Sequence, residues 1–333
     1  MTTSDLISIV IVNYNAGAWL PRCLDYIAQQ TYPYWEVIIV DNASQDGSLA
    51  LVENRDRVTI IRNRENRGFA AAQNQGIAIA CGRYIMALNY DLIMVPDFLE
   101  ELVRALDADA AAGWATGKLL NMALDGEKLN TIYAAGHVLA PDRFSFLRGN
   151  GESDRGQYDH PEVVFGAPGA AAMYKREMID DVSLDGQFFD EHLFMWYEDV
   201  DVDWRATRAG WHCCYIPSAV AYHVGHIGEE YREPYKSWRA TYGIRNRWLV
   251  MAANESFSSL QRNWRALFHY ELSSLLFVFR SRLVRAYLQA VWGVMTSLCY
   301  LRSKRKAQTT AKGPLVSTPG VECVGREGGD RFC

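Results

Sequence analysis

Residues 7–13 have the sequence ISIVIVN, in which β-branched apolar side chains run almost without interruption to a terminal asparagine. A short apolar run of this kind is typical of a strand that is buried on both faces. Comparable runs at residues 35–40, 58–61 and 84–88 predict further strands. We therefore expect four buried strands before residue 90.

Segments with helical spacing of apolar residues separate these strands. They cover residues 17–30, 46–54 and 68–80, and Pro96 opens a further helix. Ser44 is expected to cap the second of them. Strands that alternate with helices predict a parallel sheet with right-handed crossovers. The expected fold is α/β, a Rossmann-like, mostly parallel sheet flanked by helices.

Polar residues stand where the predicted strands end. Asn13 and Asp41 follow the first two strands, Asn66 precedes the third helix, and residues 89–91 follow the fourth strand. Ligands of open parallel sheets bind at the carboxyl ends of the strands, so we expect a site at this edge. Asp41 can accept hydrogen bonds from a ribose or a base, or it can cap a helix, and the sequence leaves both roles open.

The third predicted helix opens with Asn66-Arg67-Gly68 and continues with small residues. Glycine and alanine let a ligand approach the backbone, and a helix N-terminus favours phosphate. Arg67 adds a positive charge. The chain lacks the P-loop and G-x-G-x-x-G patterns, so ATPase and dinucleotide-dehydrogenase chemistry are not supported.

Asn89 and Asp91 flank Tyr90 after the fourth strand and project to the same side of an extended chain. Oxygen ligands spaced this way suit Mg²⁺ or Mn²⁺, which also binds substrate phosphates and would neutralise a departing diphosphate. His223 is expected just past a last strand over residues 211–216. It would be a neutral metal ligand or a donor to phosphate, although a lone histidine is more often structural.

A run of acids among aromatic residues stands out in the second half of the chain, at residues 188–201 (FFDEHLFMWYEDVD). Burying an unpaired carboxylate is costly, so acids kept in such surroundings indicate a site that handles protons, metal or sugar. Alternatively, Glu198 and Asp199 favour the dipole of a helix predicted over residues 199–209 and closed by Gly210. The five carboxylates are Asp190, Glu191, Glu198, Asp199 and Asp201.

Size and composition restrict the class of protein. The chain has 333 residues, of which 49% are hydrophobic and 22% charged, which fits one large domain with or without an appendage. The net charge of −5 shows no bias toward nucleic acid. The seven cysteines form no paired C-x-x-C motifs, so neither a zinc site nor a disulfide framework is predicted. A reducing compartment and no signal peptide are expected.

Residues 112–223 are less regular, with a strand and a glycine-rich turn expected over residues 163–174. We expect a catalytic domain over residues 1–230, a basic and aromatic helical segment over 231–306, and a disordered tail over 307–333. Residues 286–301 form the longest nearly apolar stretch, shorter than the roughly 20 residues that span a bilayer.

The helical segment is strongly basic. Such helices can lie in a membrane interface, or they can cover the globular domain or a dimer partner, and both interpretations stay open. Between residues 261 and 306 the only acid is Glu271, whereas the bases are Arg262, Arg265, Arg280, Arg282, Arg285, Arg302, Lys304, Arg305 and Lys306.

Taken in order, these motifs resemble family 2 glycosyltransferases of the GT-A fold from about residue 7 to residue 228. The resemblance has four parts: residues 9–15 with 41–44, residues 66–75, residues 89–91, and residues 189–201 with Arg205 and Gly210. Asn89 in place of the first metal-site aspartate, the His-Val-Gly element and Arg245-Asn246 resemble a rhamnosyltransferase-like branch. Asn89 is a weaker metal ligand than aspartate, and Tyr90 is bulkier than in many relatives.

The resemblance implies a role for each site residue. Asp199 would be the general base, and Asp91 with His223 would hold Mg²⁺ or Mn²⁺. The acceptor would be bound by Trp196, Glu198, Glu191 and Gly169. The residues expected at the donor nucleotide are Val12, Asn13, Tyr14, Asn15, Asp41, Asn66, Arg67, Gly68, Asn74 and Asn89.

The implied activity is inverting transfer of a sugar, with rhamnose as one candidate, from a dTDP-, UDP- or GDP-linked donor. The acceptor would be a lipid-linked or growing glycan at the inner face of the cytoplasmic membrane, in bacterial polysaccharide or lipopolysaccharide synthesis. The alternative is a non-catalytic sugar-nucleotide-binding scaffold of the same assembly. A nucleotidyltransferase would need a basic loop after the first strand, whereas residues 15–19 read NAGAW.

Overall fold

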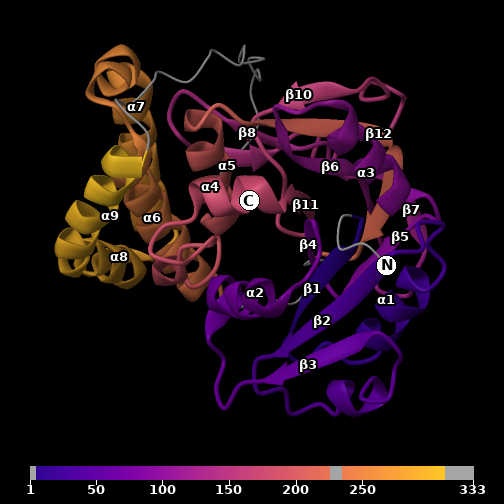
Figure 1. Ribbon diagram of the computed structural model, residues 1–333. Coiled ribbons are helices and arrows are strands. Elements are labelled where there is room, and N and C mark those ends of the chain that lie inside the picture. Colours follow the sequence, from indigo (N-terminus) through magenta and orange to yellow (C-terminus); the bar gives the residue numbers. More distant parts are fainter. Residues whose placement is uncertain (1–4, 226–234, 312–333) are drawn as a thin grey trace. The chain divides into compact units, whose positions relative to one another are not determined.

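The computed structural model describes residues 5–225 and 235–311 (Figure 1). The chain divides into two compact units. The first consists of Met1–Val138 and Leu147–Ile227, and the second of Leu139–Phe146 and Gly228–Cys333.

The first unit is built on a ten-stranded sheet. The four strands predicted in the first part of the chain are confirmed as β1 (Ile7–Asn13), β2 (Trp35–Asp41), β3 (Val58–Arg62) and β4 (Tyr84–Leu88). They pair in parallel in the order β3-β2-β1-β4. Asn13 lies opposite Asp41 in the register, so the polar strand ends do share one edge.

The other half of the sheet is mixed. β11 (Ala171–Lys175) runs antiparallel between β4 and β6 (Ala112–Met122), and β12 (His212–His223) is parallel to β6. β10 (Glu162–Val164), β5 (Leu92–Met94) and β7 (Lys128–Ala134) pair with these strands. β8 (His137–Leu139) and β9 (Ser145–Leu147) form a separate pair.

Two strand predictions in this half need correction. The strand expected over residues 163–174 is divided between β10 and β11 by a loop over residues 165–170. The last strand does not end at residue 216 but continues to His223 through a register shift between Ile216 and Val220. Pro217 lacks the N–H that a ladder needs, which accounts for an irregularity rather than an end at this point.

Helices cover both faces of the sheet. α1 (Trp19–Ile27) and α3 (Phe98–Ala108) pack on one face with side chains such as Ile9 and Ile11. α2 (Gly68–Ile79), α4 (Arg176–Val182) and α5 (Glu198–Arg208) pack on the other with Val10. Successive residues of β1 thus feed opposite cores, as expected for a doubly covered sheet.

The helix expected over residues 46–54 is wrong. Only a 3₁₀ turn forms there, η1 (Ser48–Leu51), after Gly47 with φ of +77°. Asp46 accepts hydrogen bonds from the N–H and hydroxyl of Ser48 and from the N–H of Gly17, which hold this segment as a loop. Ser44 does not cap it; the Ser44 hydroxyl instead accepts the N–H of Asn15.

The second unit is helical, with α6 (Tyr235–Asn254), α7 (Phe257–Arg280), α8 (Val284–Thr296) and α9 (Leu298–Ala311). Ser256 caps α7 by accepting the N–H of Ser259. α9 continues through residues 307–311, where a disordered tail was expected; the rest of that tail and residues 231–234 lie outside the described residues. Within the described ranges, no helix is long and apolar enough to cross a membrane.

Candidate active site

Asn13 and Asp41 join the loops that follow β1 and β2. The Asn13 amide donates to Asp41 Oδ1 at 2.7 Å and to the hydroxyls of Ser44 and Ser48 at 3.0 and 3.1 Å. Asp41 Oδ2 accepts the N–H of Ser44 at 3.3 Å, and both Asn13 and Asp41 are buried. Asn13 therefore fixes the loops in which the nucleotide-binding residues are expected.

The segment after Asn13 is more open. Tyr14 is 48% exposed, and Asn15 has φ of +54°. The Asn15 side chain accepts the N–H of Gln45 at 2.8 Å, which holds the β1 and β2 loops together from the other side. Val12 precedes Tyr14 and Asn15 in β1 and packs against the core cluster that contains Val10. A half-exposed ring above two fixed loops is a suitable surface for a flat ligand group.

The start of α2 meets the acid run. The Asn66 side chain accepts the N–H of Gly68 at 2.9 Å, and Gly68 has φ of +82°. A Cβ on Gly68 would lie 2.5 Å from Phe194, so only glycine fits. Arg67 Nη2 lies 3.8 Å from Glu191 Oε2 and keeps a side chain that is 44% exposed. A charged, accessible guanidinium is thus placed beside the predicted acceptor region.

Asn74, which is expected at the nucleotide, contacts the acid run. Its amide donates to the carbonyl of Phe189 at 2.7 Å and to Glu191 at 3.1 Å, and its oxygen accepts the N–H of Phe189 at 2.9 Å. Both ends of the amide are occupied by protein. Asn74 therefore ties α2 to the loop that carries Glu191.

Asn89, Asp91 and His223 come together although 132 residues separate the last two. His223 Nε2 lies 3.1 Å from Asp91 Oδ1 and 3.3 Å from the Asn89 amide. An octahedral ion with ligands at about 2.1 Å sets neighbouring ligand atoms roughly 3 Å apart. A carboxylate, an imidazole and an amide at these separations fit a divalent cation, and the amide oxygen faces it once the side chain is flipped.

The loop over residues 166–170 (GAPGA) connects this cluster to the acid run. The Ala170 carbonyl accepts the N–H of Asn89 at 2.9 Å. The Gly169 N–H donates to Asp199 Oδ2 at 3.0 Å, and a Cβ on Gly169 would lie 3.6 Å from that oxygen. One short loop therefore fixes Asp199 relative to the residues that could hold a metal.

The acids at the start of α5 differ in their surroundings. The Asp199 side chain is 18% exposed and also accepts the N–H of Val200 at 2.8 Å. Glu198 is buried, and its burial together with the charge of Asp199 raises its pKa well above the usual value. Asp199 is thus the accessible carboxylate of the pair, and Glu198 the one favoured in its neutral form.

Asp201 serves the fold rather than the site. It is fully buried, and its Oδ2 accepts Arg205 Nε at 2.8 Å. Arg205 also donates to the carbonyls of Val182 and Phe188, so its guanidinium fastens α4 and the acid run to α5. Asp201 can therefore remain in the core, because its charge is paired and hydrogen-bonded.

His137 and Asp203 also lie at Asp199, although neither is expected there from the sequence. His137 Nδ1 lies 2.8 Å from Asp203 Oδ2, and its Nε2 lies 3.7 Å from Asp199 Oδ2. The signal available was the spacing of Asp199 and Asp203, four residues apart in a predicted helix and so on one face. Nothing in the local sequence marks His137, which comes from β8.

Backbone strain is concentrated just before the acidic helix. Phe194, Trp196 and Tyr197 have φ of +67°, +63° and +71°. Such conformations cost of order 1–3 kcal/mol each for residues with a side chain and persist where the surroundings over-determine them. The Ala70 N–H donates to the Phe194 carbonyl at 3.2 Å, so α2 helps to hold the strained loop. Trp196, expected at the acceptor, is half-buried within it.

The model of the family described as "Glycosyl transferase family 2" matches residues 8–183, more than half of the chain. The chain belongs to glycosyl transferase family 2. The matched residues include the β1 and β2 loops, the start of α2 and the metal-capable pair Asn89 and Asp91. They end before Asp199, so the assignment of the acid run depends on the geometry.

Three curated bacterial proteins are similar to part of this family 2 protein. Glycosyltransferase GlyG of Streptococcus pneumoniae serotype 4 is 37% identical over 117 residues, 33% of this chain and 39% of the relative. The putative teichuronic acid biosynthesis glycosyltransferase TuaG of Bacillus subtilis is 31% identical over 141 residues, 41% of this chain and 56% of the relative. The succinoglycan biosynthesis protein ExoO of Rhizobium meliloti is 34% identical over 131 residues, 39% of this chain and 37% of the relative. The matches thus span less than two thirds of each relative.

Solved structures share the fold at low identity. GalNAc-T7 with UDP, GalNAc and Mn²⁺ aligns with a TM-score of 0.60 at 15% identity, over 76% of this chain and 48% of that one. The mannosyltransferase PcManGT of Pyrobaculum calidifontis, in complex with GDP-Man and Mn²⁺, aligns with a TM-score of 0.53 at 18% identity, over 93% of this chain and 86% of that one. The GT-A architecture expected from the sequence is confirmed.

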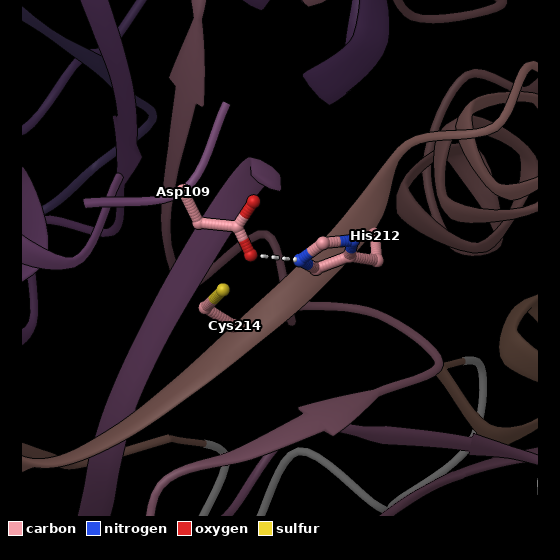
Figure 2. Close-up of side chains that lie close together, drawn as sticks. All are labelled: Asp109, His212 and Cys214. Atoms are coloured by element: carbon pink, nitrogen blue, oxygen red, sulfur yellow. Dashed lines mark hydrogen bonds and ion pairs between the residues drawn. The ribbon is translucent and has the colours of Figure 1, made fainter. Parts of the chain in front are cut away.

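The family 2 fold also carries a second group of metal-capable side chains, Asp109, His212 and Cys214 (Figure 2). His212 Nε2 lies 2.8 Å from Asp109 Oδ2, and the three ligand atoms lie within 4.8 Å of one another. The group lies at the start of β12, whereas His223 ends that strand. The β6 residues that pair with these two ends, Ala112 and Asn121, are nine positions apart, about 30 Å at 3.3 Å per residue. Lys175 Nζ donates to the Asp109 carbonyl at 2.9 Å. We assign this group no part in the candidate active site.

Proposed function

We propose that this protein is an inverting glycosyltransferase that moves a sugar from a nucleotide-diphosphate donor to a glycan acceptor. The observation that carries the proposal is the loop over residues 166–170, which holds Asp199 through Gly169 and meets Asn89 through Ala170. A carboxylate and a metal-capable cluster fixed by one loop are what a base and a diphosphate leaving group need.

Asp199 acts as the base. It takes the proton from an acceptor hydroxyl while the hydroxyl oxygen bonds to the anomeric carbon and the bond to the diphosphate breaks. The electron pair of that bond leaves with the nucleoside diphosphate. A single displacement assisted by one carboxylate inverts the anomeric centre. Glu198, Glu191 and Trp196 border the acceptor side.

Asp91, His223 and Asn89 would hold a divalent cation, Mg²⁺ or Mn²⁺. When bound, that ion supplies positive charge to the leaving diphosphate. Mn²⁺ is the first candidate, because both structural neighbours are complexes with Mn²⁺. Arg67, exposed at the start of α2, is proposed to add a further positive charge beside the donor phosphates.

The relatives and structural neighbours support the choice of donor and acceptor classes to test. The neighbours are complexes with UDP and with GDP-Man, and a dTDP-linked sugar, including a rhamnosyl donor, completes the set to be tested. The names of TuaG and ExoO place those relatives in teichuronic acid and succinoglycan biosynthesis. We propose that this chain likewise acts in cell-surface polysaccharide or lipopolysaccharide synthesis, on a lipid-linked or growing glycan at the inner face of the cytoplasmic membrane.

The helical unit supports a lipid-linked acceptor. α7 and α8 carry stripes of exposed apolar side chains at helical spacing, and positions 264, 268, 272, 276 and 279 fall within an arc of about 120°. Exposed arginines accompany them, including Arg265, Arg280 and Arg285. Apolar side chains flanked by bases complement an anionic bilayer surface. The stripes consist of Phe257, Trp264, Phe268, Leu272, Leu276 and Phe279 on α7, and Val284, Leu288, Trp292 and Met295 on α8.

We expect the double variant Phe268→Ser/Trp292→Ser to bind phosphatidylglycerol-containing vesicles at least about tenfold more weakly, because each large side chain loses about 1–2 kcal/mol of apolar burial. Co-sedimentation measures the binding, and Leu124→Ser, an exposed apolar residue of the first unit, is the matched control. Binding should fall with added salt. Unchanged vesicle binding in the double variant would assign the stripes to a protein partner instead.

The proposed activity is tested first by thermal stabilisation with UDP-, dTDP- and GDP-sugars, with and without Mn²⁺. A donor at a hundred times its dissociation constant adds about 2.7 kcal/mol to the free energy of unfolding. We expect a Mn²⁺-dependent shift with one nucleotide class. Release of that nucleoside diphosphate in the presence of a membrane extract containing lipid-linked glycan would identify transfer, whereas binding without release would favour the scaffold. Folded protein that no donor stabilises would contradict the proposal.

A further inference from the structure

We infer that His137, anchored by Asp203, is a positioning residue that holds Asp199 oriented for its work as the base. The inference rests on the proposed function, since Asp199 is the proposed base. His137 lies between the two carboxylates: its Nδ1 is 2.8 Å from Asp203 Oδ2, and its Nε2 is 3.7 Å from Asp199 Oδ2. The unit is thus carboxylate, imidazole, carboxylate.

Backbone hydrogen bonds hold the elements that carry His137 and Asp203. The His137 N–H donates to the Gly166 carbonyl at 2.8 Å, and the Ala167 N–H donates to Asp203 Oδ1 at 3.2 Å. A Cβ on Gly166 would lie 1.7 Å from Asp203 Oδ2, so residue 166 must be glycine for Asp203 to reach the imidazole. The loop that fixes Asp199 through Gly169 therefore fixes the anchor of His137 as well.

The unit is closed off from water on the side of His137 and Asp203. His137 is 5% exposed and Asp203 is fully buried, whereas the Asp199 side chain keeps 18% of its surface exposed. If Asp203 only held His137 in place, the Nε2 atom of His137 would need no charged neighbour. Here that nitrogen faces the one accessible carboxylate of the three residues, which is the arrangement expected of a group that acts through Asp199.

Charge explains what the imidazole does. Burial opposes the imidazolium, but the charge of Asp199 with the hydrogen bond and charge of Asp203 outweighs it and raises the pKa of His137. Burial raises the pKa of Asp203 to about 7, against the lowering effect of His137. Glu198, Asp199 and Asp203 lie within six residues of one helix, and all three cannot be anionic at low cost. The imidazole lies between two of these carboxylates, so it can act on Asp199 through its charge as well as its position.

His137→Gln tests this function of the imidazole. An amide N–H can still donate to Asp203, while the positive charge is lost. We expect kcat at pH 7 to fall about 10- to 100-fold, donor affinity to stay the same, and the acid limb of the kcat/KM profile to move up by about one pH unit. The sign follows from the lost cation: without it, ionised Asp199 is less favoured, so activity recovers only at higher pH. His160→Gln, an exposed loop histidine, is the control.

A measurement without donor separates this inference from the proposed function. In the full-length protein with selectively labelled histidine rings, NMR follows the titration of His137, which His137→Gln identifies among the seven histidines. We expect the His137 ring to keep its second proton to higher pH in the wild type than in either Asp203→Asn or Asp199→Asn. A His137 titration that neither carboxylate variant moves, or an unmoved pH profile in His137→Gln, would overturn the inference. Activity retained by Asp199→Asn would instead reject the base itself.

Discussion

Replacing Asp199 with asparagine is expected to lower kcat for sugar transfer by about 10³-fold, within the 10²–10⁴-fold range of general-base catalysis. The amide cannot accept the proton of the acceptor hydroxyl, although it can keep the contact that the Gly169 N–H makes with the carboxylate. Donor affinity should therefore change by less than about twofold, because the metal-capable cluster and the nucleotide loops are untouched.

The measurement pairs initial rates of nucleoside diphosphate release with a binding titration of the same donor. Asp180→Asn, which removes an exposed acid of α4 in the same unit, is the matched control and should behave as wild type. Glu198→Gln is the informative companion, since burial and Asp199 already favour the neutral form of Glu198. If Asp199→Asn were fully active and Glu198→Gln were inactive, the base would be assigned to residue 198 instead.

Replacing Asp91 with alanine is expected to lower kcat/KM by at least about 100-fold and to abolish the Mn²⁺ dependence of donor binding. Asp91 is the only carboxylate that the structure places beside His223 Nε2, among the contacts described for residues 5–225 and 235–311. Without it, an imidazole and an amide remain, and these are poor ligands for a hard divalent cation.

Calorimetric titration of the nucleoside diphosphate with and without Mn²⁺ measures this effect. Asn89→Asp is expected to have the opposite effect. A carboxylate at that position should tighten Mn²⁺ binding, because it adds a charged ligand near His223 Nε2. Asp125→Ala, an exposed acid on a loop, is the control. Equal Mn²⁺ dependence in the wild type and in Asp91→Ala would remove the metal from this site.

Particular strands show how much of the fold can be predicted from the sequence. β1 to β4 are apolar runs that stay buried on both faces, so local composition alone predicts them. β6 was missed, because Gly113, Thr116, Gly117 and Lys118 interrupt its pattern. These residues are nevertheless buried within the sheet, between β11 and β12, which are distant in sequence. A strand whose burial depends on such neighbours leaves a weak local signal.

The candidate site divides in the same way. The strand-end rule and the motif resemblance select Asp41, Asp91, Asp199 and His223 from the sequence alone. Neither predicts which side chains also hold loops together. Asn13 and Asn74 do so, since their amides bond to protein partners. Asp201 does too, because it pairs with Arg205 in the core.

The sequence by itself determined the class of fold, the edge of the sheet where the polar residues gather, and the family. These depend on periodicity and on the order of short motifs, which are local properties of the chain. The tertiary structure alone decided that the loop over residues 166–170 joins the metal-capable cluster to Asp199, and that His137 lies between Asp199 and Asp203. Those contacts join segments tens of residues apart, and packing brings them together without any periodic trace in the sequence.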